Sequence, residues 1–266
     1  MNKLAIIGGT GVYNPDLLEY TQEKMSLTPY GEMSYVRGVY QDREIIFMTR
    51  HGKEHSIPPH QINYRANIYG LKQLGVTAII ATTAVGSTHA EVKPGEMMIP
   101  DQFLDFTHAR PSTFFDGAPF PVAHVDMTEP YCPILRELIC NGLRELAFPF
   151  HQKGTYVCTE GPRFETAAEV KLFHRWGGDV VGMTNVPECQ LAREAEMAYA
   201  TISMVTNYGA GVSPTPLTHS EVVEAMTQNS SRFRDLLVWI FTHFDDHMDS
   251  PAFHAMAEYG GFQVQS

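Results

Sequence analysis

The sequence of 266 residues is short of positive charge. It holds 19 Lys and Arg residues against 30 Asp and Glu residues, which gives a formal net charge of -11 at pH 7. A protein of this charge would as a whole repel nucleic acids and anionic membrane surfaces. We therefore expect neither as a partner, and an anionic ligand would have to be held by a local pocket.

Cysteines and long apolar runs are also scarce. The four cysteines form no C-x-x-C pair, and their spacing fits neither a disulfide framework nor a zinc knuckle. The apolar run of residues 4–8 is too short for the core of a signal peptide. No other run approaches the roughly 20 residues of a membrane span. These absences predict a cytoplasmic protein.

Internal repeats, low-complexity tracts and flexible linkers are absent, so we expect one domain over residues 1–266. Short apolar runs alternate instead with amphipathic segments. The runs cover residues 4–7, 44–48, 78–81, 155–158, 180–183 and 200–205, and the amphipathic segments include residues 166–176, 188–196 and 218–244. This alternation predicts an α/β fold with a largely buried sheet. Residues 245–266 fit no pattern and form a tail of undetermined structure.

A glycine turn follows the first predicted strand, at the strand end where ligands of α/β folds bind. Residues 7–11 read Ile-Gly-Gly-Thr-Gly, so backbone N–H groups and the Thr10 hydroxyl can approach an anion. The turn is not the dinucleotide fingerprint, because Asn14 stands where a third glycine is needed. It favours a phosphate cradle, and a purely structural turn is the alternative.

A basic segment follows the second predicted strand. Residues 49–55 read Thr-Arg-His-Gly-Lys-Glu-His. Arg50 can fork two donors onto one phosphate group, and His51 can add a third donor. The alternative is a surface loop with ordinary basic residues.

The same segment raises the question of a zinc site, because His51, His55 and His60 stand four and five residues apart. Gly52 and the prolines at 58–59 disfavour a helix that would present two of these histidines on one face, and the H-E-x-x-H pattern is missing. We therefore expect no metal.

Four further segments end predicted strands, at residues 81–87, 159–166, 182–188 and 206–211. Together they offer hydroxyls, an aromatic face, a carboxylate, a thioether and a carboxamide, from Thr83, Thr184, Phe164, Glu165, Met183 and Asn207. Taken singly, each has an ordinary structural explanation: Glu165 as an acid in the first turn of a helix and Asn207 as a turn residue.

Taken together and in this order, these segments resemble the trimeric purine nucleoside phosphorylase and methylthioadenosine phosphorylase family. The resemblance runs from Ile6 to about Phe244. It implies a single α/β domain with a mixed, partly barrel-like central sheet flanked by helices. It also implies a homotrimer or a pair of trimers.

The resemblance further implies the site residues and their ligands, a purine nucleoside and inorganic phosphate as co-substrate, with no other cofactor. Asn207 and His51 would act in catalysis. Phosphate would be held by Thr10, Arg50, His51, Thr83, Ala84 and Thr184. The nucleoside would contact Phe164, Glu165, Met183, Asn207, Tyr208, Gly209 and His219, together with His124 reaching in from a neighbouring subunit.

Within the family, a few residues indicate which nucleoside is cleaved. The methylthioadenosine branch generally has Ser at the place of Glu165 and an Asp-x-Asp pair at Asn207 and Gly209, whereas the 6-oxopurine branch has the residues found here. His219 fits the place of a histidine that meets a ribose 5′-hydroxyl. The resemblance therefore implies phosphate-dependent cleavage of inosine or guanosine.

Three alternatives remain open at this point. The nearest is a methylthioadenosine or methylthioinosine phosphorylase, which would share the fold and the phosphate site. A nucleoside-binding regulatory protein on the same scaffold would have no need of Arg50, His51 and Thr184 together. A nicotinamide-dependent oxidoreductase is disfavoured by the incomplete glycine fingerprint.

Overall fold

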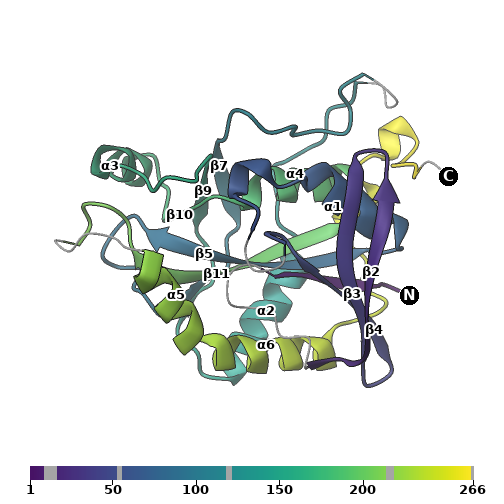
Figure 1. Ribbon diagram of the computed structural model, residues 1–266, viewed down its shortest axis with the longest axis horizontal. Coiled ribbons are helices and arrows are strands. Elements are labelled where there is room, and N and C mark those ends of the chain that lie inside the picture. Colours follow the sequence, from purple (N-terminus) through teal and green to yellow (C-terminus); the bar gives the residue numbers. More distant parts are fainter. Residues whose placement is uncertain (9–16, 53–55, 118–121, 214–218, 265–266) are drawn as a thin grey trace.

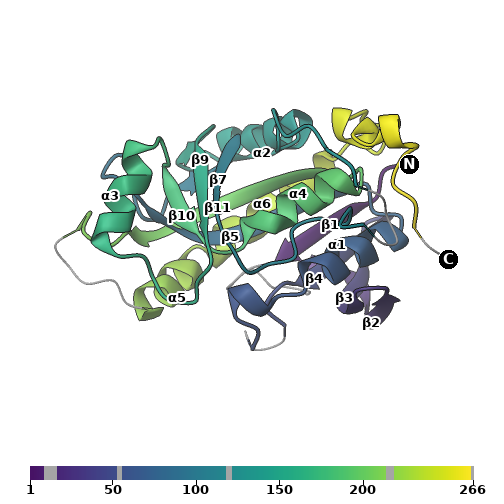
Figure 2. The ribbon, with the colours of Figure 1, turned by 90° about the horizontal axis from the view of Figure 1, so that it is seen from above.

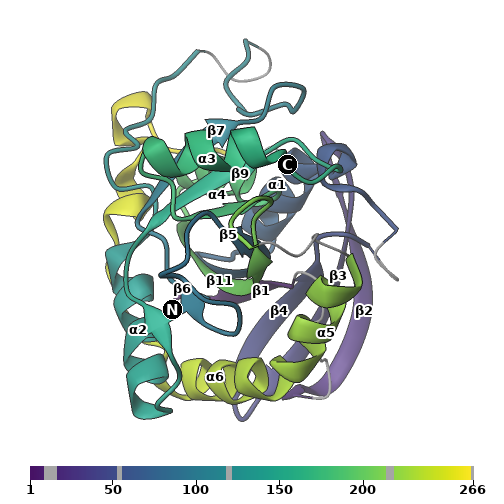
Figure 3. The same ribbon diagram turned by 90° about the vertical axis from the view of Figure 1, so that its left-hand side faces the viewer.

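The fold is a mixed β-sheet between two layers of helices, as Figure 1 shows for the computed structural model. The structure describes residues 1–8, 17–52, 56–117, 122–213 and 219–264. Helices α1 and α4 cover one face of the sheet, and α2 and α6 cover the other (Figures 1 and 3). The expected α/β class with a mixed sheet is confirmed.

The strands pair in the order β2-β3-β4-β1-β5-β10-β9-β7, and β11 joins β5 to the short pair β6 and β8. Their bounds are β1 Leu4–Gly8, β2 Glu19–Thr28, β3 Gly31–Tyr40, β4 Arg43–Thr49, β5 Ala78–Ser87, β6 Met97–Met98, β7 Gln102–Phe106, β8 Phe150–His151, β9 Thr155–Thr159, β10 Val180–Gly182 and β11 Ala198–Tyr208. Strands β1, β4, β5 and β11 run parallel, while β2, β3 and β4 form an antiparallel meander.

The helices are α1 Tyr64–Gln73, α2 Pro133–Glu145, α3 Ala167–Arg175, α4 Asn185–Glu194, α5 His219–Gln228 and α6 Ser230–His243. Short 3-10 turns occupy Pro59–Gln61, Pro251–His254 and Ala257–Tyr259. Helix α3 begins at a capping box in which the Thr166 hydroxyl accepts from the backbone of Glu169 and the Glu169 carboxylate accepts from the backbone of Thr166. Figure 2 shows α4 lying over the central strands with α1 beside it.

The amphipathic segment predicted over residues 218–244 contains two helices, α5 and α6. The chain leaves helical geometry at Asn229, whose φ and ψ are -98° and 2°. Its side chain donates to the carbonyl of Ala225 and so closes the end of α5. The single amphipathic pattern is therefore interrupted by one polar residue, which a hydrophobic periodicity does not reveal.

The central strands are buried on both faces, and their side chains alternate between two cores. In β1, Leu4 and Ile6 pack in the core under α2 and α6, whereas Ala5 and Ile7 pack in the core under α1 and α4. This double burial explains why the strands read as continuous apolar runs in the sequence.

Strand β5 positions the site, because one of its edges changes partner along its length. β11 pairs with β5 from Ala78 to Ser87. On the opposite edge, β1 pairs with residues 78–81 and β10 with residues 86–87. Residues 82–85 lie between these two partners, and the sheet opens there.

The C-terminal segment, left undetermined by the sequence, packs on the body of the domain. The carboxylate of Glu196 accepts from the backbone N–H groups of Met256 and Phe262, at 3.1 and 2.9 Å. The ring of Phe262 lies against Tyr69 and Phe114 in the core under α1. Residues 245–264 are therefore an integral part of the fold.

Candidate active site

A cavity of about 360 Å³ opens at the carboxyl ends of the central strands. This is the size class of pockets that hold small ligands. The residues that line it come from the chain after β4, from the second half of β5, from β10 and the loops after β9 and β10, from the end of β11 and from α5. They are Arg50, His51, Ser56, Pro58, Pro59, Thr83, Ala84, Val85, Gly86, Pro162, Phe164, Glu165, Val181, Gly182, Met183, Thr184, Thr206, Asn207, Gly209 and Val222.

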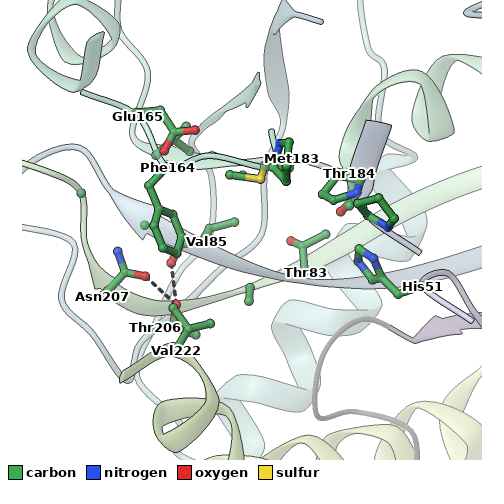
Figure 4. Close-up of a pocket in the computed structure, with 18 of the residues that line it drawn as sticks. His51, Thr83, Val85, Phe164, Glu165, Met183, Thr184, Thr206, Asn207 and Val222 are labelled. Carbon is green, nitrogen blue, oxygen red and sulfur yellow. Dashed lines mark hydrogen bonds between the residues drawn. The ribbon is translucent and has the colours of Figure 1, made fainter. Parts of the chain in front are cut away.

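The cavity has two chemically distinct ends (Figure 4). His51, Thr83 and Thr184 gather at one end. Phe164 and Asn207 lie together at the other end, with Glu165 above Phe164 in this view. The thioether of Met183 lies between the two groups. Residues that are far apart in the sequence thus divide into a hydroxyl and imidazole end and an aromatic and amide end.

Arg50 is buried, and its fork is directed at a carboxylate. Its Nε and Nη2 donate to the two oxygens of Glu188 at 2.6 and 2.7 Å, and its Nη1 donates to the carbonyl of Thr82 at 3.1 Å. Although burial lowers the pKa of a guanidinium, the adjoining Glu188 outweighs this effect and raises the pKa of Arg50. Both side chains are fully buried.

This geometry changes the expected role of Arg50. The sequence predicted that Arg50 forks onto a phosphate, but the fork of Nε and Nη2 is occupied by Glu188. A guanidinium has five N–H groups, and these three bonds use three of them. Arg50 is among the residues that border the cavity, but its side chain has no exposed surface, so an anion would reach the remaining N–H groups of Nη1 and Nη2 only after a local shift.

One ring nitrogen of His51 is engaged by the backbone. Its Nδ1 lies 2.9 Å from the carbonyl oxygen of Ile57, and a carbonyl can only accept. Nδ1 therefore carries the proton, so Nε2 is the nitrogen that can face a ligand. A neutral His51 would accept a hydrogen bond at Nε2. The donor role that was predicted from the sequence requires a protonated His51.

Glu165 lies half-buried beside the aromatic end of the cavity. The hydroxyl of Thr159 donates to its Oε1 at 2.6 Å. Burial raises the pKa of Glu165, and this hydrogen bond opposes the effect only in part. The carboxylate is thus held in place by the strand that precedes its loop.

Asn207 is held at both ends of its carboxamide. Its Oδ1 accepts from the hydroxyl of Thr206 at 2.8 Å, and its Nδ2 donates to the carbonyl of Tyr208 at 2.9 Å. A register shift in β11 between Val205 and Asn207 precedes this arrangement. The amide nitrogen carries two hydrogens, and the bond to Tyr208 uses one.

Tyr208 itself is not among the residues that line the cavity. Consecutive side chains of a strand point to opposite faces, so we expect the Tyr208 side chain on the face opposite Asn207. Tyr208 contributes its backbone carbonyl, which accepts from Asn207. Gly209 does line the cavity, and a Cβ there would lie 2.9 Å from the carbonyl oxygen of Ser87. Glycine is therefore required for the close approach of β11 and β5 at this point.

Three predicted site residues, Thr10, His219 and His124, stand apart from this geometry. Thr10 lies outside the described residues, as does His55 of the zinc alternative. His219 begins α5, but its side chain is also outside the described part. His124 is exposed and does not line the cavity of its own chain; its backbone N–H donates to the hydroxyl of Tyr259.

Glu188 and Val222 are among the residues of the site that were not singled out from the sequence. Glu188 was seen only as a member of a motif, and its pairing with Arg50 joins residues 138 positions apart. Val222 reaches the cavity from α5. Its place at the start of an amphipathic helix gave no signal beyond core packing.

The described residues contain no group of three or more His, Cys, Asp and Glu side chains that could hold a metal ion. Within the same ranges, no helix is long and apolar enough to cross a membrane.

Comparison with known families decides which family this cavity belongs to. The phosphorylase superfamily matches residues 3–241. The chain belongs to the phosphorylase superfamily.

Individual relatives within this superfamily are close. The chain is 56% identical over 243 residues to the 6-oxopurine nucleoside phosphorylase of Pyrococcus furiosus, covering 90% of this chain and 91% of that protein. It is 51% identical over 257 residues to a probable 6-oxopurine nucleoside phosphorylase of Dictyoglomus turgidum, covering 97% of each. A crystal structure of a methylthioadenosine phosphorylase from an antarctic soil metagenomic library superposes with a TM-score of 0.88 at 37% identity, covering 97% of this chain and 91% of that one.

Proposed function

We propose that this protein is a 6-oxopurine nucleoside phosphorylase. It uses inorganic phosphate to split the N-ribosidic bond of inosine or guanosine, and it releases the purine base and ribose 1-phosphate. The observation that carries the proposal is the pair formed by the carboxylate of Glu165 and the carboxamide of Asn207 at one end of the cavity. The names of the relatives from Pyrococcus furiosus and Dictyoglomus turgidum support it.

Glu165 reads the hydrogen on the purine ring. A 6-oxopurine carries a hydrogen on N1, and an ionised Glu165 can accept a hydrogen bond from this N1–H. It can also accept one from the 2-amino group of guanine. Adenine presents a lone pair at N1, which would face the carboxylate. A buried mismatch of this kind can cost on the order of 10⁴ in selectivity.

Asn207 stabilises the leaving base. As the bond between C1′ and N9 lengthens, negative charge grows on the purine, and an amide donor aimed at N7 binds the transition state more tightly than the ground state. The Nδ2 hydrogen that is not used by Tyr208 is the one that can take this role.

The opposite end of the cavity would hold the phosphate that attacks C1′. The hydroxyls of Thr83 and Thr184, the outer N–H groups of Arg50 and the Nε2 of His51 provide the contacts, with Ala84 as a small neighbour and Thr10 outside the described part. The nucleophile is the bound anion, so positioning it beneath the sugar is the main task of this end. Phe164 and Met183 would pack against the nucleoside between the two ends.

A methylthioadenosine phosphorylase is the second candidate, and one observation favours it. Val222 of α5 lines the cavity and offers an apolar contact, which suits a 5′-methylthio group better than a hydroxyl. The fold of the antarctic methylthioadenosine phosphorylase is also close. The two candidates share the phosphate end and differ in the base and in the 5′-group that each recognises on the nucleoside.

Turnover of inosine, guanosine, adenosine and methylthioadenosine, each with and without phosphate, tests the proposal. We expect phosphate-dependent cleavage with the highest kcat/KM for inosine or guanosine. A higher kcat/KM for methylthioadenosine than for inosine would replace the proposed function by the second candidate. Cleavage that is independent of phosphate would contradict both.

The assembly is proposed on the resemblance to the trimeric family. We infer a homotrimer or a pair of trimers, in which His124 of one subunit completes the nucleoside site of its neighbour. The exposed position of His124, outside the cavity of its own chain, supports this role.

A further inference from the structure

Arg110 lies in the long connection between β7 and α2, and its guanidinium is buried beneath the cavity-lining loops. Its Nη1 donates to the carbonyl of Val186 at 2.7 Å and to the hydroxyl of Tyr64 at 3.1 Å. Its Nη2 donates to the carbonyls of Glu160 and Thr159 at 2.8 and 3.2 Å, and its Nε to the Glu160 carboxylate at 3.4 Å. One side chain thus bonds to three separate segments.

The segment of Thr159 and Glu160 leads to the aromatic end of the cavity. Thr159 ends β9, and Glu160 begins the loop that carries Phe164 and Glu165. The Thr159 hydroxyl also holds the Glu165 carboxylate. Arg110 therefore fixes the root of the loop that presents Glu165.

The other two segments form the neighbouring walls. The Tyr64 hydroxyl, which accepts from Arg110, donates in turn to the carbonyl of Pro59 at 3.0 Å, and Pro59 lines the cavity. Val186 closely follows Met183, which lies between the two ends of the cavity. The guanidinium of Arg110 is therefore linked by hydrogen bonds, directly or through Tyr64, to all three segments that surround the expected nucleoside.

The charge of Arg110 is balanced by Glu160. The carboxylate of Glu160 also accepts from the backbone N–H of His108 at 2.9 Å. Burial would raise the pKa of Glu160, but the His108 amide and the charge of Arg110 outweigh it and lower that pKa. The pair therefore stays ionised at neutral pH, and the fork geometry persists.

We propose that Arg110 is a positioning residue for the nucleoside: it sets the distances between the walls formed by Pro59, Met183 and Glu165 without touching the substrate. The inference rests on the proposed function. It concerns the nucleoside more than the phosphate: in the described part of the chain Arg50, at the phosphate end, bonds to Glu188 and Thr82, which are not partners of Arg110, whereas Thr184 shares one of the three walls with Met183.

The test compares Arg110→Lys with Arg43→Lys. Lysine keeps the charge and loses the planar fork. Arg43 is a matched control, because it donates to the carbonyl of Phe241, pairs with Asp246 and lies 5.3 Å from an aromatic ring centre, as Arg110 lies 5.3 Å from that of Tyr64. Arg43 stands at the start of β4, away from the cavity-lining residues.

For Arg110→Lys we expect the KM for inosine to rise about tenfold and kcat/KM to fall by about 10²-fold, the scale of a misplacement of about 1 Å. The KM for phosphate should rise less than about threefold, because Thr184 is the phosphate contact that lies on a segment held by Arg110, and Arg43→Lys should change neither constant. Equal increases in both Michaelis constants, or equal losses in the two variants, would overturn the positioning role.

A second variant decides the case if Arg110→Lys does not fold. Tyr64→Phe removes only the hydroxyl that joins Arg110 to Pro59, and it should raise the KM for inosine about threefold with an unchanged KM for phosphate. An unchanged KM for inosine would contradict the proposal. The unaltered protein is assayed beside it with inosine and methylthioadenosine. If only the latter is cleaved, the proposed substrate is wrong, and the same two Michaelis constants, measured with methylthioadenosine, judge Arg110.

Discussion

At the scale of single residues, the site depends on polar groups whose orientation is set by their neighbours. The carboxamide of Asn207 is held by Thr206 on one side and Tyr208 on the other. The imidazole of His51 is held by the carbonyl of Ile57. Such bonds decide which atom of each side chain faces the ligand, and that choice decides the chemistry.

Asn207→Asp should lower kcat/KM for inosine by about 10²-fold or more, because the donor for the leaving base is lost. The structure adds a second reason: a carboxylate oxygen would replace Nδ2 opposite the carbonyl of Tyr208, and the two would repel each other. Steady-state kinetics with inosine measure the effect, and thermal unfolding controls for stability. Activity within about threefold of the unaltered protein would remove Asn207 from the catalytic step.

The raised pKa of Glu165 predicts a pH effect. Since burial raises this pKa above the ordinary 4.5, the carboxyl takes up a proton at a higher pH than an exposed glutamate does. The protonated form is no longer an ionised acceptor for N1–H. We expect kcat/KM for inosine, measured at saturating phosphate, to fall on acidification with an apparent pKa above 4.5. The same acidic limb in Glu165→Gln would assign it to another group.

At the scale of elements, α4 joins the site to the rest of the domain through two buried carboxylates. Glu188 in its first turn pairs with Arg50, and Glu194 in its last turn accepts from the backbone of Phe114 and the hydroxyl of Thr113. The helix thereby docks both the segment after β4 and the long connection between β7 and α2.

The ion pair between β4 and α4 makes Arg50→Ala a test of stability as well as of phosphate binding. Alanine would leave Glu188 buried without its partner, and such a loss costs about 3–5 kcal/mol in the free energy of unfolding. The double variant Arg50→Ala, Glu188→Gln should recover much of this loss while the KM for phosphate stays high. Thermal unfolding and phosphate titrations separate the two effects. A double variant that regains phosphate affinity would remove Arg50 from the phosphate site.

Glu194 predicts a pH dependence of stability. Burial raises the pKa of Glu194 to about 7, so between the ordinary 4.5 and about 7 the unfolded chain loses a proton that the folded protein keeps. The contribution of Glu194 to the free energy of unfolding is therefore fully present below pH 4.5 and is lost as the pH rises towards 7, by up to about 3 kcal/mol. Glu194→Gln removes this dependence. The melting temperature of this variant minus that of the unaltered protein should therefore increase from pH 5 to pH 8. A constant difference would contradict this shift.

At the scale of the whole molecule, the described chain presents a cavity at the strand ends and an exposed His124 outside it. If His124 serves the site of a neighbouring subunit, each site of His124→Ala is inactive because the subunit beside it lacks the imidazole. A neighbouring subunit that has an intact His124, even with a defective cavity of its own, should restore the activity of that site.

Mixed assemblies test this expectation. His124→Ala and Asn207→Ala should each have low activity alone, and trimers reassembled from both should regain part of it, because some sites then combine an intact Asn207 with an intact His124. Light scattering should give three or six times the chain mass of 29.8 kDa for both variants. No regain of activity on mixing, at unchanged mass, would show that His124 does not act between subunits.

Much of the architecture followed from the sequence, because it depends on local patterns. The predicted runs at residues 4–7, 44–48 and 78–81 became β1, β4 and β5, since strands buried on both faces are apolar throughout. The hairpin of β2 and β3 was not predicted. β2 is an edge strand, and most of its residues are exposed, so it has no apolar run.

The sequence by itself placed the motifs from Arg50 to Asn207 at strand ends, because each motif directly follows or ends an apolar run, and parallel strands end at one edge of the sheet. Only the tertiary structure decided what those side chains bind. Arg50 meets Glu188 from α4, and Arg110 meets Tyr64, Glu160 and Val186. The partners of a buried charge are chosen by long-range packing, since every donor must be satisfied where the chain happens to bring an acceptor, and local spacing carries no record of that meeting.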